Sequence, residues 1–326
     1  MRRVMPGKII YSCPFVPAEW IAAHGFQPSR IAPSSYHKAA YQGACAYASA
    51  FADLVETSDA DACILTTMCD QMRRMHDTIP QSVDKSVFLM NVPHTWETPN
   101  SRRMYLDEVL RLGRFMERLG GEHPTDERLT DVMCMYDATR ERLRGMRGSV
   151  GPRRYSEMIG DFNADGSMPE QPREAAPKLN GVPVAIVGGP LMTAHMDLFD
   201  LVGRHGGYIA LDATENGERG IPAPFDRRRL AEEPLRVLVD AYFGSIPDAA
   251  RRPNSLLYQW LSREIESRGI RALIFVRYVW CDIWHAEAQR MKEWFGLPML
   301  DLDITGESND LSRNSTRIQA FMEMLR

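Results

Sequence analysis

The sequence lacks the short motifs that identify several common enzyme classes. Its 326 residues contain no Walker A phosphate-binding loop, no GxSxG serine elbow, no HExxH zinc motif and no CxxC pair. These absences argue against P-loop nucleotide hydrolysis, serine-hydrolase chemistry and HExxH metalloprotease chemistry. Any catalytic centre must therefore be built from residues that stand far apart in the chain.

Long apolar runs and an excess of one charge are also missing. No segment approaches the roughly 20 apolar residues of a membrane span, and the first residues, MRRVMPGKIIYSC, include no apolar stretch of signal-peptide length. The formal net charge is only -4, with acidic and basic residues interspersed, so nothing favours a polyanionic partner. We therefore expect a cytoplasmic protein that binds neither membrane nor nucleic acid.

Cysteine is scarce and unpaired in the sequence. Six cysteines are scattered along the chain without close even spacing, a pattern typical of reduced thiols and not of a disulfide framework. Some of them are therefore available to bind metal.

Strand-like runs alternate with helical patterns in both halves, which predicts an α/β protein of two Rossmann-like or flavodoxin-like lobes with parallel sheets. The expected strands are Ser29–Ala32, Ala62–Thr67, Ser86–Asn91, Val182–Val187, Tyr208–Asp212, Ala272–Val279 and Met299–Leu302. The expected helices outside the middle of the chain are Pro17–His24, Ala44–Glu56, Gln71–Ile79, Ser255–Arg268, His285–Phe295 and Ser315–Leu325.

The middle of the chain divides the two halves. Apolar residues recur at helical spacing over Arg102–Leu119 and Pro124–Leu143, which predicts a helical segment that bridges or covers the first lobe. Gly160–Lys178 is rich in Pro, Gly, Asn, Asp and Glu and has no apolar rhythm. The sequence thus predicts an N-terminal lobe over 1–159, a linker over 160–180 and a C-terminal lobe over 181–326.

Three cysteines stand beside short polar signatures. Cys69 and Cys281 directly follow the apolar runs 62–67 and 272–279, so they are expected at the carboxyl ends of buried strands, where open α/β sheets bind ligands. Cys45 opens a helical pattern, CAYASAF, where amide groups and the helix dipole stabilise a thiolate. Together the three suggest a three-thiolate cluster site, although a free cysteine more often only fills space.

The other three cysteines fit that simpler interpretation to different degrees. Cys63 lies inside an expected strand and Cys134 inside the helical run VMCMY, so both are expected in the core. Cys13 precedes Pro14 in a loop-like segment and is left open between packing and a role near a metal or substrate.

Two turns in the second half are further candidates. The doublet Gly188–Gly189 follows an expected strand, where it serves either packing or a bound ligand. The acidic turn DATENGERG follows another, so Glu218 and Arg219 either touch a ligand or pair with each other. Both turns are assigned to substrate binding as hypotheses.

Several segments in collinear order carry a family resemblance over nearly the whole chain. They are PFVPAEWIAAHGFQPSRI, CAYA at Cys45, CDQMRRMHD at Cys69, GGPLM, GGYIALDATENGERG, WCDIWHAEAQRMKEWFGLPMLDLD at Cys281 and the ending TRIQAFMEML. These segments resemble the 2-hydroxyacyl-CoA dehydratase and benzoyl-CoA reductase family, whose subunits hold a four-iron cluster by three cysteines.

The resemblance implies that Cys45, Cys69 and Cys281 bind an oxygen-sensitive [4Fe-4S] cluster. One iron would then lack a protein ligand, leaving a position for an acyl-CoA substrate. An ATP-hydrolysing iron–sulfur activator would supply the low-potential electron, and a homologous subunit or a second copy would complete the enzyme. The first expectation is a 2-hydroxyacyl-CoA dehydratase, a lyase that eliminates water through a ketyl radical. Alternatives are a benzoyl-CoA reductase-type or double-cubane reductase subunit.

Residues around the ligand motifs are expected to tune the cluster. These candidates are Asp70, Arg73, Asp282, His285 and Glu287. The two aspartates are equally well explained as helix caps, and His285 has no partner at zinc spacing.

Two positions depart from the family pattern. Ser34, a substrate-binding candidate, stands where some substrate-reducing subunits carry a glutamate, and Ser49 replaces an arginine. A non-catalytic electron-relay subunit is therefore a further expectation. A redox-inert α/β binding protein with six core thiols is another.

Overall fold

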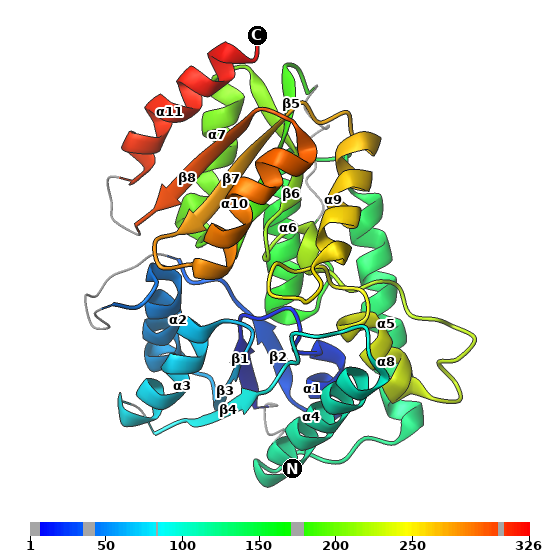
Figure 1. Ribbon diagram of the computed structural model, residues 1–326. Coiled ribbons are helices and arrows are strands. Elements are labelled where there is room, and N and C mark those ends of the chain that lie inside the picture. Colours follow the sequence, from blue (N-terminus) through cyan, green and yellow to red (C-terminus); the bar gives the residue numbers. More distant parts are fainter. Residues whose placement is uncertain (1–6, 35–42, 83, 171–178, 306–309) are drawn as a thin grey trace.

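The computed structural model describes residues 7–34, 43–82, 84–170, 179–305 and 310–326. Two four-stranded sheets with helices on their faces form two lobes (Figure 1). Every pair of neighbouring strands within each sheet runs parallel. The prediction of an α/β protein with two parallel-sheet lobes is confirmed. Within the described ranges, no helix is long and apolar enough to cross a membrane.

The N-terminal sheet has the strand order β2-β1-β3-β4. Its elements are β1 Lys8–Tyr11, α1 Ala18–Ala23, β2 Gln27–Arg30, α2 Ala46–Thr57, β3 Ala62–Thr66, α3 Asp70–Ser82 and β4 Ser86–Met90. β3 is buried along its whole length, because it is an interior strand with helices on both faces.

Three helices connect the lobes: α4 Pro99–Arg118, α5 Asp126–Gly145 and α6 Pro152–Asp165. The hydroxyls of Thr98 and Thr125 accept the amide hydrogens of Ser101 and Arg128 and so cap α4 and α5. α6 begins with a proline at its first turn and ends at Gly166, whose φ of 75° suits a glycine. These local signals fix where each helix begins or ends.

The C-terminal sheet has the corresponding order β6-β5-β7-β8. Its strands and the segments between them are β5 Val182–Gly188, η1 Thr193–Met196, α7 Asp197–Arg204, β6 Gly207–Ala213, η2 Glu218–Gly220, α8 Pro234–Phe243, α9 Ser255–Ser267, β7 Ala272–Tyr278, α10 Asp282–Phe295, β8 Met299–Ile304 and α11 Asp310–Met324. In both sheets the chain adds strands first toward one edge and then toward the other. The direction reverses between β1 and β3 in the first sheet and between β5 and β7 in the second.

Helix α8 belongs to the packing of the other lobe. Its buried side chains, including Val237 and Phe243, join the core formed by β1, β3, β4, α1 and α4, and Tyr105 of α4 stacks on Phe243 at 4.7 Å between ring centroids. The chain thus returns to the N-terminal lobe after β6. The division into 1–159, 160–180 and 181–326 stays a prediction.

The sequence prediction missed β1, α6, α7 and α8. β1 is only four residues long, and α7 and α8 are short, so each gives little periodic signal. In α6 the apolar residues Tyr155, Met158, Ile159 and Phe162 do recur at helical spacing and are buried. The helix continues to Asp165, so the loop begins later than Gly160, and residues 171–178 of the predicted linker lie outside the described residues.

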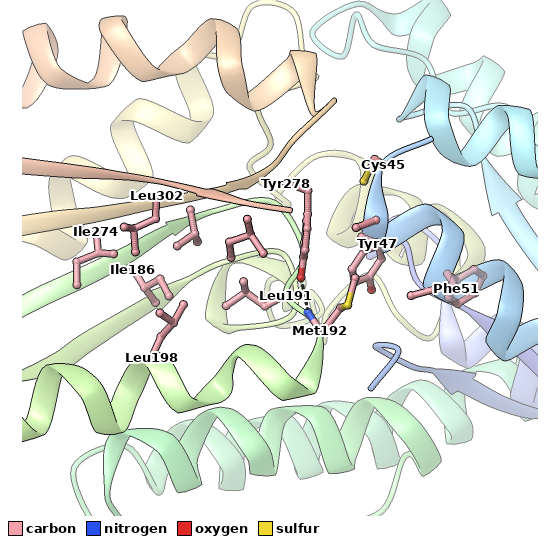
Figure 2. Packing of buried hydrophobic residues seen from close by; sticks show 14 of the residues in the cluster. Cys45, Tyr47, Phe51, Ile186, Leu191, Met192, Leu198, Ile274, Tyr278 and Leu302 are labelled. Atoms are coloured by element: carbon pink, nitrogen blue, oxygen red, sulfur yellow. Dashed lines mark hydrogen bonds between the residues drawn. The ribbon is translucent and has the colours of Figure 1, made fainter. Parts of the chain in front are cut away.

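One apolar cluster runs from α2 of the N-terminal lobe into the C-terminal sheet. Figure 2 shows Tyr47 and Phe51 of α2 beside Met192 and Tyr278 of the second lobe. The rings of Tyr47 and Tyr278 are 5.9 Å apart, and the Tyr278 hydroxyl accepts the amide hydrogen of Met192 at 2.9 Å. The two lobes therefore share a core beside the ends of their central strands.

Candidate functional site

A cavity lies at the carboxyl ends of the four central strands, β1, β3, β5 and β7. Residues at or just beyond the end of β1, β3, β5 and β7 all contribute to its wall, as expected for a site at the point where strand order changes. The lining residues are Ser12, Cys13, Pro14, Phe15, Cys45, Tyr47, Ala48, Thr66, Met68, Cys69, Met72, Gly189, Pro190, Glu215, Asp248, Arg277, Tyr278, Cys281, Ile283 and Trp284.

The three cysteines predicted as ligands line this one cavity. Cys69 follows the end of β3 and Cys281 the end of β7, as the sequence predicted, and Cys45 precedes α2. Each stands directly before the first residue of a helix, Ala46, Asp70 or Asp282. Three chain segments, two from the N-terminal lobe and one from the C-terminal lobe, thus bring three cysteine residues to the lining of one cavity.

Burial dominates the electrostatics of these thiols. Desolvation raises the pKa of Cys69 to about 12 and raises the pKa of Cys45 and of Cys281 as well. Backbone groups of the following helical turn partly oppose the rise, and the charges of the other thiols add to it for Cys69 and Cys281. Without a cation the thiols are therefore protonated at neutral pH, and metal binding would release protons.

The spacing of the sulfurs bears on which metal group would suit them. Among the described residues, one group of three potential ligands lies within 4.8 Å, and it does not include these cysteines. Thiolates around a single tetrahedral zinc ion would lie about 3.8 Å apart, given a zinc–sulfur distance of about 2.3 Å. A four-iron cluster takes each thiolate on a separate iron, which demands wider spacing. The three cysteine sulfurs are not all within 4.8 Å of one another, and together with the mainly apolar lining they are a donor set that could hold such a cluster.

Two carboxylates share the cavity with the cysteines. Glu215 and Asp248 both contribute to its lining. Burial, followed by the charge of Asp248, raises the pKa of the Glu215 carboxyl to about 7, while Arg219 and Arg30 oppose the rise. Glu215 can therefore hold or release a proton near neutral pH.

Sequence reasoning missed both carboxylates. It selected the acidic turn DATENGERG but chose Glu218 and Arg219 within it. Glu215 stands two residues after the end of β6, which is the position that the strand-end argument points to. Asp248 follows α8 and gives no comparable local signal.

The Arg219 side chain is fully buried and does not line the cavity. Its guanidinium donates to Asp248 at 2.6 Å, to the Gly188 carbonyl at 2.9 Å and to two further carbonyls, and it lies 4.9 Å from the centroid of the Trp284 ring. These hydrogen bonds use four of the five guanidinium N–H donors. Arg219 therefore positions the cavity wall, and in particular the carboxylate of Asp248.

Of the other residues predicted to bind substrate, Gly189 lines the cavity and Gly188, Glu218 and Ser34 do not. Gly189 lines the cavity, whereas a Cβ on Gly188 would lie 1.9 Å from the carbonyl oxygen of Val276, so packing against β7 explains that glycine. Glu218 is buried away from the cavity and pairs with Arg147 and with Arg268, at 2.8 Å to the latter. Ser34 is exposed and does not line the cavity.

The residues expected to tune the cluster lie outside the cavity lining. Asp70, Arg73, Asp282 and His285 are exposed, and Asp70 and Arg73 form a surface pair at 3.4 Å. Asp70 and Asp282 are the first residues of α3 and α10, where a negative charge favours the helix dipole. The N-cap of α10 is Cys281, with no side-chain capping hydrogen bond, so the prediction of Asp282 as a helix cap is wrong. Glu287 is buried and accepts hydrogen bonds from Asn254 at 2.7 Å and Tyr258 at 2.6 Å, so it joins α10 to α9.

The remaining cysteines separate as follows. Cys63 is fully buried inside β3, in agreement with a core role. Cys134 is half-buried on α5, where Arg227 lies 3.0 Å from its sulfur. Cys13 lines the cavity, and burial raises the pKa of its thiol to about 12. A fourth sulfur thus shares the cavity with the three predicted ligands.

An arginine joins the two lobes beside the cavity. Arg30 at the end of β2 donates to the Ser12 carbonyl at 2.9 Å and to the Gly220 carbonyl at 3.0 Å, and its third contact is the Glu215 carbonyl. Ser12 belongs to the N-terminal lobe and the other two to the acidic turn of the C-terminal lobe. Arg30 therefore holds that turn, and Glu215 with it, against the end of β1.

Comparisons with known proteins extend over nearly the whole chain. The profile of the family described as 2-hydroxyglutaryl-CoA dehydratase, D-component, matches residues 13–325. The chain is 21% identical over 293 residues to the Escherichia coli (strain K12) protein named "Putative dehydratase subunit YjiM", which covers 82% of this chain and 74% of that protein. A mutant laminin-binding adhesin (Lmb) from Streptococcus agalactiae aligns over 98% of this chain and 99% of its own, with 10% identity and a TM-score of 0.23, a similarity too weak to support an argument.

Proposed function

The chain belongs to the 2-hydroxyglutaryl-CoA dehydratase D-component family, and from that premise we propose that it is an iron–sulfur subunit of a 2-hydroxyacyl-CoA dehydratase. Cys45, Cys69 and Cys281 are the proposed ligands of one [4Fe-4S] cluster. The observation that carries the proposal is their convergence: three thiols from two lobes, separated by 24 and 212 residues, line one cavity at the ends of the central strands.

The proposed cluster would supply a low-potential electron and an open iron position for an acyl-CoA thioester. The protein's own contribution begins with exclusion of water. The cavity is lined largely by apolar and aromatic side chains, among them Phe15, Met68, Met72 and Trp284, which lower the local dielectric and strengthen interactions with charge.

Elimination of water from a 2-hydroxyacyl group breaks a carbon–oxygen bond and a carbon–hydrogen bond. The departing hydroxyl needs a proton, and Glu215 is a cavity carboxyl that burial keeps protonated close to neutral pH. Asp248 is held in place by Arg219 at 2.6 Å and raises the proton affinity of Glu215 by its charge. We assign proton transfer to Glu215: its carboxyl gives a proton to the departing hydroxyl, and the carboxylate so formed takes the proton released from carbon. Arg219 positions Asp248.

The partners in this proposal are an ATP-hydrolysing iron–sulfur activator and a homologous second subunit or a second copy of this chain. The proposed compartment is the cytoplasm, where thiols stay reduced. A benzoyl-CoA reductase-type or double-cubane reductase subunit and a non-catalytic electron-relay subunit are the other outcomes that the experiments below distinguish.

The first test measures iron and acid-labile sulfide, with an electron paramagnetic resonance spectrum, on protein purified without oxygen. We expect about four irons per chain in the wild type, a loss of iron and signal in Cys69→Ser, and retention of both in Cys63→Ser. Cys63 is the matched control because it is a fully buried thiol outside the cavity lining. An iron-free wild type, after anaerobic reconstitution, would refute the cluster proposal.

A second test separates a substrate-reducing subunit from a relay subunit. Titration with a 2-hydroxyacyl-CoA should perturb the cluster spectrum saturably if the thioester reaches the cavity. A spectrum that does not respond to any acyl-CoA, in protein with a full complement of iron, would contradict the dehydratase assignment and favour the relay.

A further inference from the structure

A second group of metal-binding side chains lies in the N-terminal lobe. The potential ligand atoms of His24, Glu117 and His123 all lie within 4.8 Å of one another. His24 follows α1 and precedes β2, Glu117 is in the last turn of α4, and His123 lies in the segment between α4 and α5. This is the amino-terminal side of β2, whereas the cysteine-lined cavity is at the carboxyl ends of the strands. The two sites are therefore separate.

One ring nitrogen of His24 is hydrogen-bonded to the backbone, and the other is available to bind a metal ion. Its Nδ1 lies 2.8 Å from the Trp20 carbonyl oxygen, which can only accept, so Nδ1 carries the proton and Nε2 presents a lone pair. The side chain is 1% exposed, and its Nε2 has no hydrogen-bond partner. Metal-bound histidines in proteins nearly always donate their other ring N–H to a carbonyl or carboxylate in this way.

The buried lone pair is costly without a partner. A buried polar atom left unsatisfied is destabilising, and a cation beside Nε2 would remove that cost. Gly113 keeps the space open, because a Cβ there would lie 3.1 Å from Nε2.

Glu117 and His123 complete the group from the solvent side. The Glu117 carboxylate lies 2.8 Å from His123 Nδ1, and the two side chains are 37% and 65% exposed, so both can adjust around an ion. The nearby cation Arg128 is paired with Glu122 at 3.3 Å. Two imidazoles and one carboxylate, with an open side for water, form a ligand set that zinc uses in proteins.

We propose that His24, Glu117 and His123 bind a divalent transition-metal ion, with zinc the best match, and that the ion fastens the turn before β2 to the end of α4. Backbone contacts already join these segments, since the Glu122 amide donates to the His24 carbonyl at 3.2 Å. The site is independent of the proposed cluster and uses none of its residues.

The test compares zinc binding by the wild type, His123→Ala and His76→Ala, each as full-length protein. His76 is the matched control: it is a partly exposed histidine 3.1 Å from a carboxylate, Asp77, and belongs to no group of three ligands within the described residues. Cobalt(II) replaces zinc in a parallel titration, because nitrogen and oxygen ligands give visible bands without the strong near-ultraviolet charge transfer of thiolates. The readout therefore distinguishes this site from the cysteines.

We expect one cobalt or zinc ion per chain with nitrogen and oxygen ligation in the wild type and in His76→Ala. We expect at least tenfold weaker binding in His123→Ala, together with loss of the rise in Tm that zinc gives the wild type. His123 is exposed, so its truncation should leave the circular dichroism spectrum unchanged. Equal affinity in wild type and His123→Ala, or ligation by thiolate alone, would overturn the proposal.

Discussion

At the scale of single residues, the environment decides chemistry more than residue type does. Glu215 and Glu218 stand three positions apart in the same acidic turn. Glu215 lines the cavity, whereas Glu218 forms ion pairs with two arginines outside it. Cys63 and Cys69 differ in the same way, one inside a strand and the other beyond its end. The residue that faces the cavity is in each case the one available for chemistry.

The raised pKa of Glu215 gives a pH-dependent stability. Between about pH 4.5 and about pH 7 the folded protein keeps a proton that the unfolded chain releases, so this carboxyl favours folding at low pH and opposes it as pH rises through about 7. In cluster-free protein, we expect Glu215→Gln to be more stable than wild type at pH 8 by on the order of 1 kcal/mol and to match it at pH 4.5. Guanidinium denaturation at both pH values measures this.

The exposed residue Glu232 provides the control for that measurement. Glu232→Gln should leave the pH dependence of the wild type unchanged. If Glu215→Gln were less stable than wild type at pH 8, the assignment of a buried, proton-retaining carboxyl would be wrong.

At the scale of secondary-structure elements, the site depends on strand ends and on the helices that follow them. β5 and β7 are adjacent, and the Gly188 position at the end of β5 pairs with Val276. The absence of a side chain there lets the backbones approach and lets the chain turn toward the cavity at Gly189. A glycine doublet that the sequence left open between packing and ligand binding therefore serves both, one residue for each.

Gly188→Ala tests the close approach of β5 and β7. A Cβ 1.9 Å from the Val276 carbonyl oxygen forces the strands apart, so we expect destabilisation by about 2–4 kcal/mol. Gly203→Ala in α7 is the matched control, because a Cβ there meets nothing within 4 Å, and helix propensity predicts a gain of about 0.5–1 kcal/mol. Urea unfolding of the two variants should move in opposite directions, and similar curves would contradict the packing argument.

At the scale of the whole molecule, the cavity exists only where two lobes meet. Each lobe supplies at least one proposed ligand. The lobes are joined beside the cavity by the Tyr47–Tyr278 contact (Figure 2) and also by the hydrogen bonds of Arg30. α8 returns to the N-terminal lobe after β6, so the chain crosses between lobes more than once. The distance between the cysteines is thus set by the interface as well as by each fold.

Arg30→Lys tests this coupling of the lobes. A lysine has no planar fork and cannot reach the three carbonyl acceptors of Arg30 at once, so we expect a loss of about 2–4 kcal/mol in stability and faster hydrogen exchange in the acidic turn. Arg236→Lys is the control, because that side chain is 72% exposed and its ion pair at 3.5 Å contributes little. Unchanged exchange near Glu215 in Arg30→Lys would contradict the coupling.

The sequence by itself determined the fold class and most strand positions. Alternating apolar strands and helical periodicity are local signals, and they located β3 and β7 closely enough to place Cys69 and Cys281 beyond strand ends. These local signals did not predict β1, which has only four residues. They also did not predict α6, in which the buried apolar residues are interspersed with many polar ones.

Only the tertiary structure decided which of these segments meet. Glu215, Asp248 and Cys13 reach the cavity because loops from different strands converge there. Arg219 instead donates to four protein acceptors, three of which lie 28, 29 and 31 residues away in the sequence. His24, Glu117 and His123 likewise share no spacing that a motif could record. Local sequence fixes the period and ends of an element, whereas long-range packing fixes the neighbours of its side chains, and chemistry depends on those neighbours.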